Sequence, residues 1–270
     1  MTIDNVQLRK DFNVDMDLTG KKILITGVSR PMGIGATLAK RLSEAGAEVA
    51  IHGFSDYDLV MKHLTAMPSG TETLAKELNV TLITPSDLEI AGNAEKVVAE
   101  AVAKLGTLDG MILNHTNGDS VEIGNWTPEH IDPILNVNIR ASMMMLQAFA
   151  AQVDTTKNSA VTLFTSGQYL GPMVDEIAYC VSKEALICLC RQASYLLADK
   201  NIRVNCINPG PVDTGYCFGE VHKAVAEMFP SGRWGMPDDT ADLVQFLHSD
   251  YAKWITGQVI ASEGGFNRYK

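Results

Sequence analysis

The chain has 270 residues, 46% of them hydrophobic and 20% charged, and a formal net charge of -10 at pH 7. This length suits one large core, while the acidic balance, without a run of Lys and Arg, argues against a nucleic-acid partner. No run of 18 apolar residues is present and the first twenty residues are polar, so we expect a cytoplasmic protein with no membrane partner. Five cysteines without a disulfide or zinc spacing predict reduced, buried thiols and no metal site.

Short apolar runs alternate with amphipathic segments along the whole chain. The apolar runs predict strands at residues 21–27, 47–53, 81–87, 108–116, 159–167, 202–210 and 257–265. The segments with a helical period predict helices at 34–46, 93–106, 130–153 and 176–200. Strands rich in Val, Ile and Leu that alternate with helices predict the α/β class. We expect a single-domain Rossmann fold, with a doubly wound, seven-stranded parallel sheet and helices on both faces.

Two segments depart from this even spacing. Residues 52–79 form a long crossover that is broken at Pro68-Ser69-Gly70, and residues 211–237 are rich in Gly, Pro and aromatic side chains. We expect the second segment to be a substrate lid within one domain that spans 16–270 and follows an N-terminal arm, 1–15. Its aromatic residues would either face an apolar substrate or pack the lid onto the body; they are Tyr216, Phe218, Phe229 and Trp234.

The turn TGVSRPMGIG, residues 26–35, follows the first expected strand and opens the first expected helix. Gly27 permits a tight exit from the strand, and Gly33 and Gly35 allow the backbone to approach a pyrophosphate closely. The free amides of the helix that starts at Ile34 favour the negative charge of that pyrophosphate. Ser29 and Arg30 lie in the lip of the turn, where a guanidinium can pair with a phosphate.

The end of the second strand bears on which dinucleotide binds. No acid stands near Gly53, so no carboxylate would repel a 2′-phosphate, and Ser55 offers a hydroxyl. Together with Arg30 this favours NADP(H), with NAD(H) as the alternative. NAD(H) becomes the better interpretation if Asp56 or Asp58 turns toward the ribose.

Four polar residues form a candidate catalytic set. Tyr179 and Lys183 are four residues apart and therefore share a helix face, where an ammonium would favour the phenolate. Ser166 ends the strand thirteen residues before Tyr179, and Asn138 lies on the preceding long helix. A hydroxyl and a phenol that meet over a carbonyl group could bind its oxygen and exchange a proton with it.

In their order, these motifs resemble the short-chain dehydrogenase/reductase family over roughly residues 16–267. The resemblance rests on TGxxxxxGIG, Asp87-Leu88, Asn114 in ILNH, VNI, Ser166, Tyr179-x-x-x-Lys183, NPGPVDT and ITGQ. It implies that Tyr179 exchanges a proton with the carbonyl oxygen, which Ser166 polarises. It also implies that Lys183 lowers the pKa of Tyr179 and holds the nicotinamide ribose, and that Asn138 binds a water linking Lys183 to solvent. The implied cofactor contacts are Asp87 with adenine, and Pro209, Gly210, Val212 and Thr214 around the nicotinamide.

Two features depart from the family pattern. The usual Asn-Asn-Ala-Gly becomes Asn114-His115-Thr116-Asn117, and His115 is either a catalytic base or, as we favour, a packing and hydrogen-bonding residue. The glycine turn has the length found in the enoyl-carrier-protein reductase branch. That branch places its Lys seven residues after the Tyr, where this chain has Leu186, so the carbonyl-reductase arrangement is favoured.

The function expected from the resemblance is an NADP(H)-dependent oxidoreductase that interconverts a carbonyl and a secondary alcohol. It would reduce a ketone or 3-oxoacyl substrate, in the manner of 3-oxoacyl-carrier-protein reductases. The alternatives are an NAD-dependent alcohol, sugar or steroid dehydrogenase and, less favoured, a non-catalytic dinucleotide sensor. Apolar residues on more than one face of the two long helices predict a homo-oligomer, a tetramer or a dimer.

Overall fold

The computed structural model describes residues 16–215 and 217–267, so the expected arm and Tyr216 lie outside the described residues. Its seven strands form one parallel sheet in the order β3-β2-β1-β4-β5-β6-β7. The strands are β1 Lys22–Thr26, β2 Glu48–His52, β3 Thr81–Leu82, β4 Gly110–Leu113, β5 Ser159–Phe164, β6 Ile202–Asn208 and β7 Val259–Ala261. The predicted doubly wound sheet is therefore confirmed.

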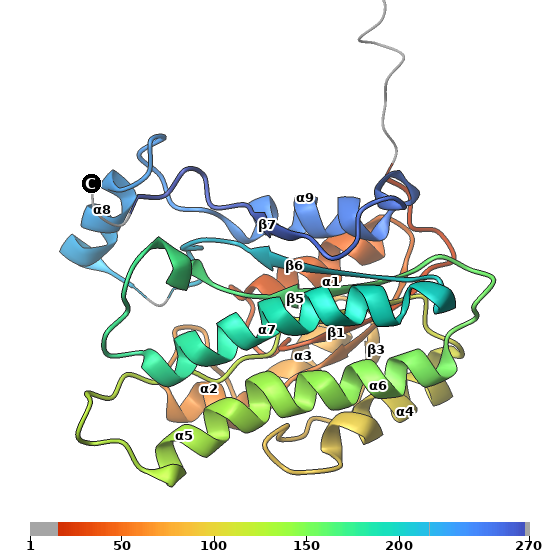
Figure 1. Ribbon diagram of the computed structural model, residues 1–270, viewed down its shortest axis with the longest axis horizontal. Coiled ribbons are helices and arrows are strands. Elements are labelled where there is room, and N and C mark those ends of the chain that lie inside the picture. Colours follow the sequence, from red (N-terminus) through yellow and green to blue (C-terminus); the bar gives the residue numbers. More distant parts are fainter. Residues whose placement is uncertain (1–15, 216, 268–270) are drawn as a thin grey trace, which may run out of the picture.

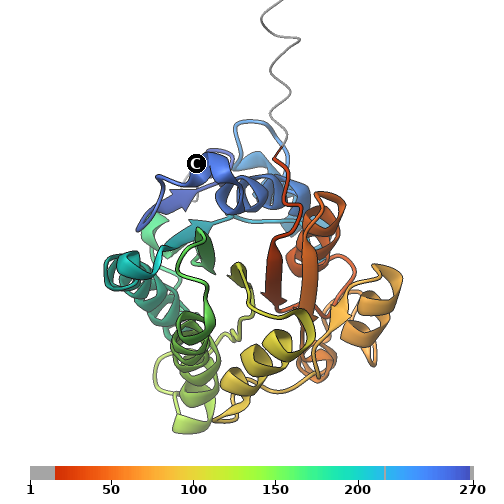
Figure 2. The ribbon, with the colours of Figure 1, turned by 90° about the vertical axis from the view of Figure 1, so that its right-hand side faces the viewer.

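Helices cover both faces of the sheet (Figures 1 and 2). One face packs against α1 (Ile34–Glu44), α3 (Gly70–Glu77) and α9 (Pro237–His248), around a core that includes Leu38, Leu74 and Val244. The other face packs against α4 (Asn93–Leu105), α6 (Ser142–Gln152) and α7 (Ile177–Leu196). No helix within 16–215 or 217–267 is long and apolar enough to cross a membrane.

Three segments differ from the expected helices. The segment 130–153 is divided into α5 (Pro128–Leu135), a π-helical turn (Asn136–Ala141) and α6. The long crossover contains two helices, α2 (Ser55–Val60) and α3, joined by residues 61–69. The lid segment carries α8 (Gly219–Glu227), and α9, which the sequence analysis did not predict, follows it.

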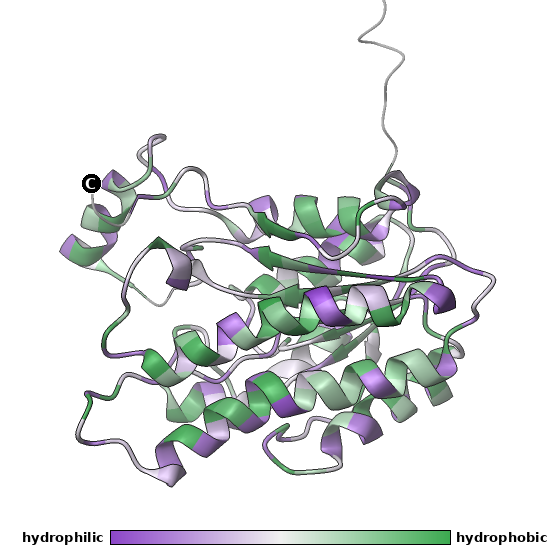
Figure 3. Cartoon of the chain, in the orientation of Figure 1, coloured by the Kyte–Doolittle hydropathy of each residue, from purple (hydrophilic) through white to green (hydrophobic). Residues whose placement is uncertain are grey.

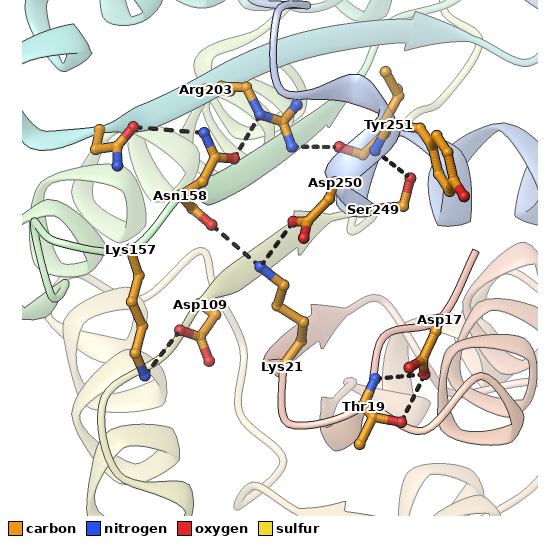
Figure 4. A network of polar contacts seen from close by, with 12 residues as sticks. Asp17, Thr19, Lys21, Asp109, Lys157, Asn158, Arg203, Ser249, Asp250 and Tyr251 are labelled. Atoms are coloured by element: carbon orange, nitrogen blue, oxygen red, sulfur yellow. Dashed lines mark hydrogen bonds and ion pairs between the residues drawn. The ribbon is translucent and has the colours of Figure 1, made fainter. Parts of the chain in front are cut away.

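A polar network closes the edge of the sheet where the strands begin (Figure 4). Lys21 Nζ lies 3.6 Å from Asp250 Oδ1 and 3.5 Å from the Asn158 carbonyl oxygen, to which it donates. The buried Arg203 donates from Nε to Asn158 Oδ1 at 2.9 Å and from a terminal nitrogen to the Leu247 carbonyl oxygen at 2.7 Å. These bonds connect the loops at this edge of the sheet, and Lys21, Asn158 and Asp250 line a cavity of about 460 Å³ there. The glycine turn and Ser166 lie at the other edge.

Three histidines are buried between the sheet and its helices. Burial lowers the pKa of His52 to about 4 and those of His115 and His248 to about 3. His248 Nε2 lies 3.1 Å from Thr162 Oγ1, and His115 Nδ1 lies 2.7 Å from Thr26 Oγ1. These values lie well below the ordinary imidazole pKa of 6.5, so all three histidines are neutral in the fold at neutral pH.

We predict that acid destabilises the fold between about pH 6.5 and pH 4. In this window the unfolded chain binds protons that the folded chain cannot, so each buried histidine removes about 1.4 kcal/mol of unfolding free energy per pH unit. Urea unfolding of the wild type and His248→Gln at several pH values measures the slope. The variant should have the shallower slope, and equal slopes would contradict the assignment of a neutral His248.

Candidate active site

The seven parallel strands end at one edge of the sheet, on the left of Figure 1, where α2, α8 and the start of α7 also lie. In a doubly wound sheet, ligands bind outside the carboxyl ends of the strands. The predicted glycine turn follows β1, Asn114 follows β4, Ser166 follows β5 and Pro209 follows β6. The topology therefore gathers the predicted cofactor and catalytic residues at this edge.

The glycine turn packs backbone against backbone. Gly27 has a φ of +72°, and a Cβ at this position would lie 2.8 Å from the backbone of His115. A Cβ on Gly35 would lie 2.4 Å from the Gly27 carbonyl oxygen, which accepts a hydrogen bond from Asn114 Nδ2 at 3.0 Å. Side chains are excluded at both positions because β1, α1 and the end of β4 approach so closely.

The start of α1 fits an anionic group. The helix begins at Ile34 with Gly33 as its N-cap, no side chain caps it, and its first turn holds no acid. The amides of this first turn and the helix dipole favour a phosphate. The glycine turn and the uncapped helix together suit the pyrophosphate of a dinucleotide.

Ser166, Tyr179 and Lys183 come together at the junction of β5 and α7. Ser166 follows the last residues of β5, and Tyr179 stands in the first turn of α7, where its phenol is hydrogen-bonded to the Ser166 side chain. Lys183 Nζ lies 5.4 Å from the centre of the Tyr179 ring and donates to the Phe164 carbonyl oxygen at 3.0 Å. The structure thus brings the three predicted catalytic side chains to one place.

The electrostatics of this cluster differ from the expectation that Lys183 lowers the pKa of Tyr179. Burial of the phenol raises the pKa of Tyr179 to about 12, and the hydrogen bond with Ser166 offsets only part of this rise. Burial lowers the pKa of Lys183 to about 8. Because burial disfavours both charged forms, Tyr179 is a neutral phenol at neutral pH.

Asn138 joins three elements near the catalytic cluster. It lies fully buried in the π-helical turn, a conformation often found at functional sites. Its Nδ2 donates to the Asn117 carbonyl oxygen and to Ser182 Oγ, both at 2.8 Å, and its Oδ1 accepts from the Asn117 amide at 2.7 Å. The side-chain amide therefore holds the loop after β4 against α7. The predicted bond from Asn138 to a water stays a prediction.

Of the two interpretations of His115, the geometry supports the hydrogen-bonding one. Its Nδ1 faces Thr26 Oγ1 on β1, and its Nε2 lies 3.3 Å from Ser142 Oγ on α6. The ring is buried and both nitrogens have a hydroxyl partner. His115 therefore connects the sheet to α6.

The guanidinium of Arg30, which was expected to pair with a phosphate, is already bonded to other groups of the protein. Its Nε lies 3.0 Å from Asp58 Oδ1, and one terminal nitrogen donates to the Thr214 carbonyl oxygen at 3.2 Å. Ser29 Oγ donates to the other carboxylate oxygen of Asp58. Asp58, which was considered as a ligand of the ribose, is instead paired with the lip of the glycine turn.

The other predicted cofactor residues line the same edge. Ser55 is buried, and its hydroxyl accepts from the Thr71 amide at 3.3 Å. Asp87 accepts from the Glu89 amide at 2.8 Å, and Leu88 is buried beside it. After β6, Gly210 has a φ of +66°, and Val212 and Thr214, at the start of the lid segment, are buried.

The lid aromatics divide between the two expected roles. Phe229 and Trp234 are buried, with relative exposures of 2% and 4%, and Trp234 stacks on His222 at a ring distance of 4.9 Å. These two residues pack the lid onto the body and onto itself. Phe218 is 60% exposed and is available to a substrate.

Tyr57, on α2, makes a contact that was not predicted from the sequence. Its hydroxyl donates to the Gly118 carbonyl oxygen at 3.2 Å and accepts from the Gly118 amide at 3.1 Å. A Cβ on Gly118 would lie 2.9 Å from Cδ2 of Tyr179, so this glycine packs on the ring of that predicted catalytic residue. Nothing in the spacing of the crossover indicates that α2 reaches this far.

Comparison with known proteins decides the family. A family model described as enoyl-(acyl carrier protein) reductase matches residues 27–267. A solved mutant structure of a Serratia marcescens short-chain dehydrogenase/reductase superposes with a TM-score of 0.81 at 27% identity, covering 92% of this chain and 98% of that one. The chain belongs to the short-chain dehydrogenase/reductase family. It is therefore an oxidoreductase of a family that uses NAD(H) or NADP(H).

The relatives within this family differ in activity. The oxidoreductase YjdA of Bacillus subtilis is 32% identical over 92% of this chain and 97% of its own length. An NAD-dependent glycerol dehydrogenase of Listeria innocua is 28% identical (95% and 98% covered), and the 3-oxoacyl-[acyl-carrier-protein] reductase FabG of Rickettsia felis is 29% identical (93% and 98%). A solved blue fluorescent protein from a metagenomic library, in complex with NADPH, has a TM-score of 0.81 at 25% identity (93% and 99%).

We predict that Gly35→Ala destabilises the fold by roughly 1–3 kcal/mol, because the added methyl group meets the Gly27 carbonyl oxygen. Gly33→Ala is the matched control: its φ is -74° and its nearest neighbour would lie 3.2 Å away, so the cost should stay under about 1 kcal/mol. Urea unfolding compares the two variants. Equal stabilities would contradict the close packing of the turn.

Proposed function

We propose that this oxidoreductase reduces a ketone or a 3-oxoacyl group to a secondary alcohol, with NADP(H) as the preferred cofactor. The observation that carries the proposal is the Ser166–Tyr179 hydroxyl pair beside Lys183. A neutral phenol is a proton donor, which is what the reduction of a carbonyl requires. The same arrangement argues against a non-catalytic sensor, which has no need for it.

Each side chain has a distinct part in the proposed reaction. The nicotinamide ring, when bound, supplies the hydride that reduces the carbonyl carbon. The Ser166 hydroxyl orients and polarises the carbonyl oxygen, and Tyr179 donates its phenolic proton to that oxygen. Lys183, with a pKa of about 8, is largely protonated at neutral pH and places a positive charge beside the ring of Tyr179 as that proton leaves.

The cofactor preference rests on the end of β2. A Cβ on Gly53 would lie 2.4 Å from the Val28 carbonyl oxygen and from Thr71 Oγ1, so an acid cannot stand at this position without a shift of the backbone. A carboxylate that would repel a 2′-phosphate is therefore excluded there, which supports NADP(H).

A second candidate is an NAD-dependent dehydrogenase of an alcohol, sugar or steroid. The observation that favours it is the pairing of Arg30 with Asp58, which removes the most obvious ligand of a 2′-phosphate. Relative affinities for NADH and NADPH separate the two candidates.

We also propose that the protein is a cytoplasmic homo-oligomer, a dimer or a tetramer that associates through α6 and α7. Met143 on α6 and Val181 on α7 are 51% and 55% exposed. Figure 3 shows hydrophobic residues along much of both helices. A second subunit would remove this apolar surface from water.

We predict that Tyr179→Phe lowers the turnover of a ketone by roughly a hundredfold to ten-thousandfold, because the proton donor is lost. The affinity for the dinucleotide should change little. Tyr195→Phe is the control, since Tyr195 lies on the same helix and is 88% exposed. Steady-state assays over a panel of ketones and 3-oxoacyl thioesters test the prediction, and a Tyr179→Phe enzyme with wild-type turnover would refute the proposal.

The two reaction directions should depend on pH in opposite ways. Alcohol oxidation needs the phenolate, whose fraction grows about tenfold per pH unit below the pKa of Tyr179, so kcat/KM for oxidation should rise from pH 7 toward pH 10. Reduction uses the phenol and should decline above about pH 8, where Lys183 loses its proton. Initial rates in both directions measure the profiles. An oxidation rate that falls with pH would contradict a neutral Tyr179.

A further inference from the structure

Three hydrogen-bond donors converge on the carboxylate of Asp58. Arg30 Nε lies 3.0 Å from Oδ1, His63 Nδ1 lies 2.9 Å from the same oxygen, and Ser29 Oγ donates to Oδ2. Asp58 is 6% exposed, and the guanidinium is largely covered as well. An ionised carboxylate can only accept, so all three neighbours donate to it.

This donor set is the kind that recognises a phosphate. A guanidinium, a hydroxyl and an imidazole N–H can all bond to the oxygens of one phosphate group, and Arg binds phosphate with particular strength. Ser29 and Arg30 belong to the lip of the glycine turn, only a few residues before the uncapped start of α1. The cluster therefore lies beside the place where the phosphates of a dinucleotide fit.

Asp58 itself comes from a different part of the chain. It stands on α2, in the crossover after β2, and reaches the lip from the side. Residues from the same crossover also contact the lip and the lid: Arg30 donates to the Leu64 carbonyl oxygen at 3.4 Å, and Leu64 would lie 2.8 Å from a Cβ on Gly215. The crossover thus supplies the carboxylate of Asp58, which pairs with the donors at the lip of the glycine turn.

We propose that Ser29, Arg30 and His63 form a phosphate subsite that Asp58 occupies, and that a dinucleotide phosphate binds by displacing the Asp58 carboxylate. This inference rests on the proposed function for the presence of a dinucleotide. Asp58 then sets a cost of binding that only a phosphate able to reach Arg30 can offset. That phosphate is either the pyrophosphate, common to both cofactors, or the 2′-phosphate of NADP(H) alone.

The test is a fluorescence titration of NADH and NADPH into the wild type, Asp58→Asn and Asp56→Asn. Asp56 is the matched control, since it is exposed on the same helix and its replacement removes the same charge. Asp58→Asn should bind about tenfold tighter or more, as expected when a charge-assisted hydrogen bond is freed for the ligand. An equal gain for both cofactors identifies the pyrophosphate, and a gain for NADPH alone identifies the 2′-phosphate.

Other outcomes would overturn the inference. Unchanged affinity, a gain matched by Asp56→Asn, or weaker NADH binding by Asp58→Asn, which would make Asp58 a ribose ligand, each contradicts it. If Asp58→Asn does not fold, Asp58→Ser keeps a small polar partner for Ser29 and His63 and serves the same comparison. A wild type that binds neither cofactor would refute the proposed function. A wild type that binds without any gain in the Asp58 variants would refute this inference alone.

Discussion

The hydrogen bond between the side chains of Ser166 and Tyr179 joins the end of β5 to the first turn of α7. Lys183 strengthens this junction from one helical turn away, because its ammonium donates to the last residue of β5. The chemistry proposed for the site needs this alignment of α7 with β5, because a shift of α7 along β5 would separate the two hydroxyls. Burial at the same junction raises the pKa of the phenol further above neutral pH, so one packing arrangement affects both the geometry and the acidity of Tyr179.

The surrounding structure supports that junction through backbone contacts that tolerate little change. Asn114 bonds the end of β4 to the glycine turn, and Asn138 bonds the next loop to α7. Tyr57 adds a contact from the crossover by holding Gly118, which packs on the Tyr179 ring. These bonds therefore link the residues predicted to bind the dinucleotide with the predicted catalytic residues, and Arg30 bonds the glycine turn to the lid segment at Thr214.

Features encoded by local spacing could be predicted from the sequence. The alternation of apolar runs and helical segments specifies the parallel sheet, and Tyr179 and Lys183 share a helix face because they are four residues apart. The π-helical turn at Asn138 could not be predicted, because one extra residue in a turn leaves the hydrophobic period nearly unchanged. Neither could the Arg30–Asp58 pair, which depends on how the crossover folds back. The pKa of Tyr179 was expected to fall because the charge of Lys183 is visible in the sequence, whereas the burial that raises it is not.

A double-mutant cycle on the Ser166–Tyr179 contact tests the central claim most directly. The value of kcat/KM for carbonyl reduction is measured for the wild type, Ser166→Ala, Tyr179→Phe and the double variant. If the two hydroxyls act as one unit on one carbonyl oxygen, the double variant should be hardly slower than Tyr179→Phe alone. Losses that multiply independently would show that the two side chains do not share a function.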